Sequence, residues 1–130
     1  MDSPKYRVKM KGKFWYLCVT DVSEGMIFIE TPLFTKLIKD FLSDEDYRFL
    51  QLTLLLRPEA GDLIRGGGGL RKIRWNIAGR GKRGGLRIIY YWDVSEDTLY
   101  MLLPYKKSKQ VDLTPEQLKT LRRLVKEGLQ

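Results

Sequence analysis

Residues 70–75 read Leu-Arg-Lys-Ile-Arg-Trp, and residues 86–92 read Leu-Arg-Ile-Ile-Tyr-Tyr-Trp. The first run has the two-residue alternation of a strand, and the second has the aromatic and β-branched content of a central strand. A glycine-rich connection over residues 79–85 joins them, and a turn over residues 93–97 leads to a third apolar run, residues 98–103. Together the three runs predict an antiparallel meander.

Helices are expected on both sides of this meander. Thr31 and Ser43 stand as N-caps ahead of two stretches with helical apolar spacing, and Pro58 stops the second. Thr114 caps a final helix, and residues 27–29 form a short strand before the first one. This order predicts an α+β fold, in which a helical hairpin and a C-terminal helix pack on a small, mostly antiparallel sheet.

The chain has the length of one compact domain. We divide it into an N-terminal extension, residues 1–25, and a single domain, residues 26–130. The extension shows no helical period, and residues 14–20 fit either one extra strand or a tail. Because the regular pattern starts at Met26, we expect the extension to be dispensable for folding unless residues 14–20 join the sheet.

The excess positive charge is concentrated in one segment. The net charge is +8, from 24 basic and 16 acidic residues. Residues 65–92 contain no acid, whereas the rest of the chain is balanced, and the basic residues of this segment are Arg65, Arg71, Lys72, Arg74, Arg80, Lys82, Arg83 and Arg87. A basic segment on a neutral body indicates either a polyanion site or a solvated loop that keeps the protein soluble.

The composition excludes several classes of site. There is no histidine, and Cys18 is the single cysteine, so a serine triad, a cysteine–histidine pair and the common zinc sites are ruled out. We therefore expect no metal and no cofactor. No apolar run reaches the length of a membrane span, and the start lacks a signal-peptide core, so a cytoplasmic protein is expected. The four glycines at 66–69 lack the Lys-Ser/Thr of a nucleotide loop, which favours a turn.

The strand period places two cations together. Lys72 and Arg74 project from one face of their strand, while Arg71 projects from the other. Arg87 interrupts an apolar strand and must reach solvent or an anion from the sheet face, the anion being either an acid on a neighbouring element or a phosphate. Because no acid lies nearby in sequence, a phosphate is expected to serve all three of Lys72, Arg74 and Arg87. Such a site can cut RNA without histidine or metal, because the 2′-hydroxyl is a built-in nucleophile and cations stabilise the phosphate's extra charge.

Four segments resemble the RelE/ParE superfamily of bacterial toxins, and within it the HigB-type branch. They are residues 43–47, 69–74, 81–91 and the Tyr105-Lys106-Lys107 turn. The resemblance runs from Met26 to the end of the chain. It implies cleavage of messenger RNA in the ribosomal decoding site and neutralisation by a helix-turn-helix antitoxin of the HigA type. The toxin is expected to be a monomer when free.

The resemblance also assigns roles by position. Lys72 and Arg74 match the basic pair that transfers protons and contacts phosphate, and Arg87 matches the arginine that steadies the scissile phosphate. Lys107 stands where the family often places an arginine that protonates the leaving oxygen. No tyrosine follows Tyr105 to orient the attacking hydroxyl, so Tyr91 or Tyr105 is the substitute. The residues expected to contact RNA are Arg71, Lys82, Arg83, Tyr91, Tyr105 and Lys106.

Two other functions stay open at this point. ParE-like members of the superfamily poison DNA gyrase and do not cut RNA, and the fold alone does not separate the two activities. A plain RNA-binding module would bind with a steep salt dependence and leave the RNA intact.

Overall fold

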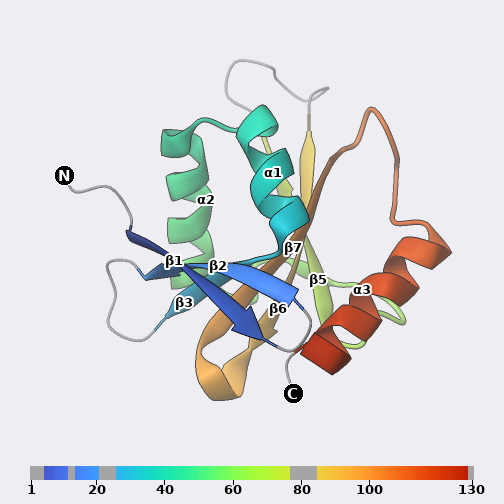
Figure 1. Ribbon diagram of the computed structural model, residues 1–130. Helices are drawn as coiled ribbons and strands as arrows, with labels where there is room; N and C mark the ends of the chain where they lie inside the picture. The colour runs from blue at the N-terminus through green and yellow to red at the C-terminus, as the bar shows by residue number, and fades with distance from the viewer. Residues whose placement is uncertain (1–4, 12–13, 21–25, 77–84, 129–130) are drawn as a thin grey trace.

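The computed structural model (Figure 1) describes residues 5–11, 14–20, 26–76 and 85–128, with side chains described at 26–76 and 85–127. The elements in chain order are β1 (Lys5–Lys11), β2 (Phe14–Thr20), β3 (Ile27–Glu30), α1 (Pro32–Phe41), α2 (Asp44–Leu56), β4 (Asp62–Leu63), β5 (Leu70–Trp75), β6 (Leu86–Asp93), a 3-10 turn (Val94–Glu96), β7 (Thr98–Lys106) and α3 (Pro115–Gly128). None of the helices in these ranges has the length and apolar content to cross a membrane.

The strands form one seven-stranded sheet in the order β1-β2-β3-β7-β6-β5-β4. Every neighbouring pair is antiparallel except β3 and β7, which run parallel. The hairpin α1–α2 covers one face, where Ile38 and Leu50 pack with Ile88 of β6. Helix α3 covers the other, where Leu121 packs with Ile89. The predicted α+β class and the placement of its helices are confirmed (Figure 1).

Residues 14–20 are a strand and not a tail. Strand β2 pairs antiparallel with β3, with Cys18 opposite Ile29, and β1 pairs along the whole length of β2. Strand β1 was not predicted, although basic and apolar side chains alternate over residues 5–11 with the two-residue period of a strand. Residues 5–11 and 14–20 therefore continue the sheet outward from β3.

The predicted helix starts are confirmed. The Thr31 side chain accepts a hydrogen bond from the backbone N–H of Phe34, and Ser43 accepts one from Asp46. The Thr31 hydroxyl also donates to the Leu102 carbonyl of β7 at 2.9 Å. This bond ties the first turn of α1 to the centre of the sheet, so capping and packing act on the same residue.

Strand β7 runs three residues beyond the predicted range of 98–103, as far as Lys106. A β-bulge shifts its register against β6 between Ile89 and Tyr90. After the bulge Tyr105 pairs with Arg87, and its side chain packs in the cluster on the α3 face. The bulge therefore decides which residues of β7 face the basic side chains of β5 and β6.

Candidate nucleic-acid interface

Three neighbouring strands place polar side chains in a single row across the sheet. Arg74 of β5 lies opposite Arg87 of β6, and Arg87 lies opposite Tyr105 of β7. Directly opposed residues in an antiparallel pair have Cβ atoms about 5 Å apart, and like charges at that spacing disfavour the pairing. We call Arg74, Arg87 and Tyr105 the cationic row. An anion bound between the two arginines would remove their repulsion.

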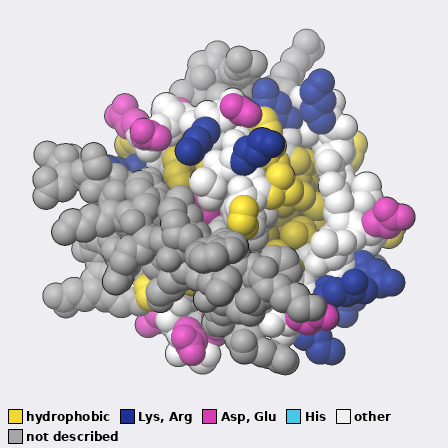
Figure 2. Space-filling model, viewed as in Figure 1, with side chains coloured by type: hydrophobic (Ala, Val, Ile, Leu, Met, Phe, Trp, Pro, Cys, Tyr) yellow, Lys and Arg dark blue, Asp and Glu magenta, His cyan; other side chains and the backbone are white. Residues whose placement is uncertain are grey.

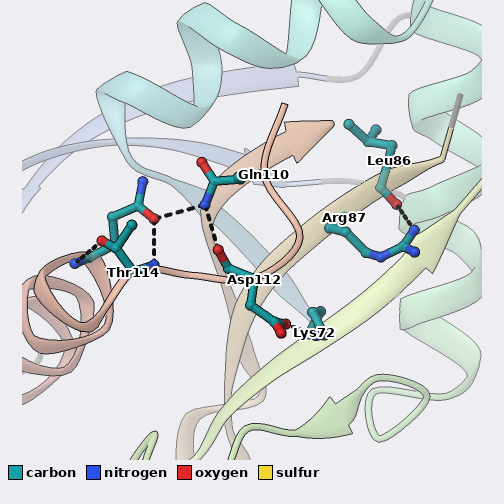
Figure 3. A network of polar contacts seen from close by, with 7 residues as sticks. Lys72, Leu86, Arg87, Gln110, Asp112 and Thr114 are labelled. Carbon is teal, nitrogen blue, oxygen red and sulfur yellow. Dashed lines mark hydrogen bonds and ion pairs between the residues drawn. The ribbon is translucent and has the colours of Figure 1, made fainter. Parts of the chain in front are cut away.

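Arg87 is a largely buried cation without an acidic partner. Its side chain is 8% exposed. Within the described residues its side chain makes one hydrogen bond, from Nη1 to the carbonyl of Leu86 at 3.5 Å, the limit of such a bond (Figure 3). Among the residues that the structure describes, no carboxylate lies within ion-pair distance of it. The structural ion pair that was the alternative explanation for Arg87 is therefore not found in this part of the chain.

Lys72 was expected to have a phosphate as its partner, but in the structure it has an acidic side chain as a partner. Its ammonium lies 2.7 Å from Oδ1 of Asp112, in the loop between β7 and α3 (Figure 3). The hydrogen bond from Lys72 and its charge lower the pKa of Asp112, and Arg87 lowers it further. Asp112 is thus ionised at neutral pH. Sequence reasoning missed this acid because it stands 40 residues from its partner and nothing local marks it.

The loop that carries Asp112 is fixed by side-chain hydrogen bonds. Gln110 Nε2 donates to the Asp112 carbonyl and to Oε1 of Gln117, both at 2.9 Å. The backbone N–H groups of Thr114 and Gln117 each bond the other residue's side chain at 3.0 Å, which confirms the predicted cap of α3. The start of α3 therefore holds Asp112 against the cationic face (Figure 3).

Tyr105 adds a neutral donor beside Arg87. Its side chain is 5% exposed, and its hydroxyl has no hydrogen-bond partner among the described residues. Burial and the charge of Asp112 raise the pKa of Tyr105, while Arg87 opposes them. The phenol is therefore protonated at neutral pH and has a hydrogen bond to give.

Lys107 lies at the same end of the sheet as the cationic row. It follows directly after β7, its side chain is exposed, and its backbone N–H donates to the Gly85 carbonyl at 3.0 Å, just before β6. Lys82 and Arg83 of the connection between β5 and β6 lie outside the described residues.

Three of the residues expected to contact RNA are not brought together with the row. Arg71 donates to the carbonyls of Gly61 at 2.7 Å and Glu59 at 3.2 Å, from the sheet face that α1 and α2 cover. The Lys106 ammonium lies 5.4 Å from the centre of the Phe41 ring of α1. Tyr91 shares the face of Arg87 but stands four residues further along β6, about 13 Å away at the usual strand rise.

A protein-family model described as RelE toxin of RelE / RelB toxin-antitoxin system matches residues 58–130, more than half of the chain. The match begins in the turn after α2 and spans β4 to β7 and α3. It therefore contains the whole cationic row together with Lys72, Lys107 and Asp112.

Proposed function

This chain belongs to the RelE toxin family, and on that basis we propose that it is a metal-independent endoribonuclease that cuts messenger RNA on the ribosome. The observation that carries the proposal is Arg87. A buried guanidinium with no carboxylate partner in the described chain, directly opposite a second arginine, is suited to a bound phosphate.

The reaction needs only groups that this face and the RNA supply. The 2′-oxygen attacks the neighbouring phosphorus, the bond from phosphorus to the 5′-oxygen breaks, and the products end in a 2′,3′-cyclic phosphate and a 5′-hydroxyl. Arg87 and Arg74 stabilise the additional negative charge on the phosphate oxygens during this step. The Tyr105 phenol donates to the phosphate or orients the attacking hydroxyl.

Two protons must move in the same reaction. We assign their transfer to Lys72 and Lys107: Lys72 first gives its own proton to water and its neutral amine then accepts the 2′-proton, while the Lys107 ammonium protonates the leaving 5′-oxygen. The Lys72–Asp112 pair holds the ammonium in place before RNA binds. Because the side chain of Asp112 is 70% exposed, its pair with Lys72 is screened by water, and a phosphate can take over Lys72.

The ribosome contributes the rest of the geometry in this proposal. The cationic row is a single line of side chains across three strands, and the chain contains no histidine to act as an efficient general acid or base. RNA that is held in line for attack by the decoding site would need only charge stabilisation and proton transfer from the toxin.

The family implies an antitoxin partner, as its description states. We propose further that the chain is of the HigB type and that its antitoxin is a helix-turn-helix protein of the HigA type. We propose that the free toxin is a cytoplasmic monomer that needs no cofactor.

Two assays on one preparation separate the nuclease from the gyrase poison. We expect the purified protein to stop protein synthesis in a translation extract and to leave DNA supercoiling by purified gyrase unchanged. Fragments of the messenger should accumulate as synthesis stops. Inhibited supercoiling with intact messenger would instead assign the chain to the gyrase poisons, and inhibition with intact messenger and active gyrase would indicate an RNA-binding module.

A further inference from the structure

A second group of cations lies on α3, away from the cationic row. Lys119, Arg122 and Lys126 follow one another at spacings of three and four residues, so they form a stripe along one side of the helix, with Arg123 beside it. All four side chains are exposed, and within the described ranges none has a carboxylate at ion-pair distance. Figure 2 shows Lys and Arg side chains gathered at the lower right, where α3 lies in Figure 1.

Most of this stripe does not stabilise the helix that carries it, and only its last member, Lys126, stands in the final turn, where the helix dipole favours a cation. Like charges three and four residues apart on a helix repel each other and disfavour it. The apolar side of α3, with Leu121 buried against the sheet, already accounts for its packing. The stripe is therefore best explained by a ligand of opposite charge.

The stripe forms one wall of a groove of about 750 Å³. Tyr91 and Gly68, which belongs to the glycine turn at 66–69, also line it. Gly68 has φ +65°, and a Cβ there would lie 3.5 Å from Nε of Arg122. Gly69 has φ +103°, and a Cβ there would lie 2.9 Å from the Tyr91 ring. The lack of a side chain at Gly69 thus lets the main chain approach the Tyr91 ring closely, whereas at Gly68 it is the positive φ that favours glycine.

The charge in the groove is predominantly positive. Its two acids are Asp93, which already accepts a hydrogen bond from the Ser95 hydroxyl at 2.7 Å, and Glu127 in the last turn of α3. Against them stand the four cations of α3. A line of cations beside an aromatic ring in an open groove is the arrangement that tracks a nucleic-acid backbone without reading its sequence.

We propose that the groove between α3 and the glycine turn, the α3 groove, binds the phosphate backbone of RNA outside the bond that is cut. Tyr91 at its edge and Arg87 in the cationic row lie on one face of β6, about 13 Å apart at the usual strand rise. The protein would then hold RNA at two places along the same sheet face. The inference rests on the proposed function in one respect, namely that the polyanion is RNA.

The test compares two double variants of equal charge. Arg122→Gln with Lys126→Gln removes half of the cations of the α3 groove, and glutamine keeps a similar helix propensity. Lys36→Gln with Arg57→Gln is the control, because both residues are exposed, Lys36 on α1 and Arg57 at the end of α2, and the pair of Arg57 with Glu59 at 3.9 Å is exposed to solvent as well. Binding is measured between about 50 and 200 mM salt to three probes: naked messenger, empty ribosomes, and ribosomes that carry the messenger.

We expect the Arg122/Lys126 variant to bind at least tenfold more weakly at low salt, with a log–log salt slope smaller by roughly two, one unit for each lost phosphate contact. A loss with the naked messenger identifies the messenger as the source of the phosphates, and a loss with empty ribosomes identifies ribosomal RNA. Equal slopes for both double variants with all three probes would overturn the inference.

Cleavage by the same preparations keeps this result separate from the proposed function. Suppose that the salt slope of binding falls in the Arg122/Lys126 variant but the wild-type protein does not cut the messenger. The nuclease proposal then fails, and the proposal for the α3 groove stands. If the wild-type protein cuts and the slopes of the two double variants agree, the α3 groove fails and the nuclease proposal stands.

Discussion

Arg87→Ala is expected to lower ribosome-dependent cleavage by about a hundredfold to a thousandfold, the usual cost of deleting one well-placed transition-state contact. Its thermal midpoint should stay close to that of the wild type. No acid in the described chain loses its partner, and Arg74 is relieved of the like charge opposite it. Growth inhibition, cleavage and a thermal melt on one preparation measure the three quantities.

Arg87→Lys is the matched control for charge. Lysine keeps the positive charge but lacks the planar fork that holds two phosphate oxygens, so cleavage by this variant should also be impaired. A drop of several kcal/mol in the free energy of unfolding of the alanine variant would show instead that Arg87 is a structural partner of a buried acid. Wild-type cleavage by a folded alanine variant would remove the residue from the site.

Removal of residues 1–25 is expected to lower the melting temperature by several degrees while leaving cleavage measurable in the cold. The deletion takes β2 away from β3 and exposes the backbone of β3 along four paired residues. A loss of 1 kcal/mol corresponds to roughly 4 °C in a domain of this size. Activity should persist, because the cationic row lies on β5, β6 and β7, beyond β3 in the sheet order.

Removal of residues 1–12 alone is the control for this deletion. It takes away β1 but leaves β2 on β3, so its melting temperature should fall less. Identical melting curves for the two truncations and the full chain would show that β2 contributes nothing to stability. That result would restore the sequence-based expectation that the extension is dispensable for folding.

The elements that the sequence predicted are those with local causes. Thr31 and Ser43 cap helices through bonds to residues three positions ahead, and the alternation in residues 70–75 needs no distant partner to be recognised. The same alternation placed Lys72 and Arg74 on one face. Local geometry therefore accounts for the α+β class and for the placement of Lys72 and Arg74 in the candidate site.

The other features of the candidate site depend on contacts between segments that are distant in the sequence. The pair of Lys72 with Asp112 joins residues 40 positions apart, and only the folded loop before α3 brings them together. The row of Arg74, Arg87 and Tyr105 depends on the bulge in β7 and on the strand continuing through Pro104, where a sequence pattern usually ends a strand. Neither feature has a local sequence signal.

Face assignment explains why part of the expected RNA-contacting set lies elsewhere. The strand period predicted that Arg71 and Lys72 project from opposite faces of the sheet. In the structure, the Arg71 side chain donates to backbone carbonyls. Lys106 faces Phe41 for the same reason, since it neighbours Tyr105 in one strand and neighbours alternate between faces. A basic segment in the sequence shows only that positive charge is concentrated there. The face of the strand from which each side chain projects decides which groups that side chain can contact.

The most direct test of the central claim is the cleavage of one messenger in two states, naked and on programmed ribosomes, by the purified wild-type protein. Primer extension locates the cuts, and the chemistry of the new 3′ ends identifies the reaction. We expect cuts only on the ribosome, with 2′,3′-cyclic phosphate ends and with cutting by Arg87→Ala slower by at least about a hundredfold under the same conditions. Efficient, sequence-independent cutting of the naked messenger, or an intact messenger on ribosomes at high protein concentration, would contradict the account.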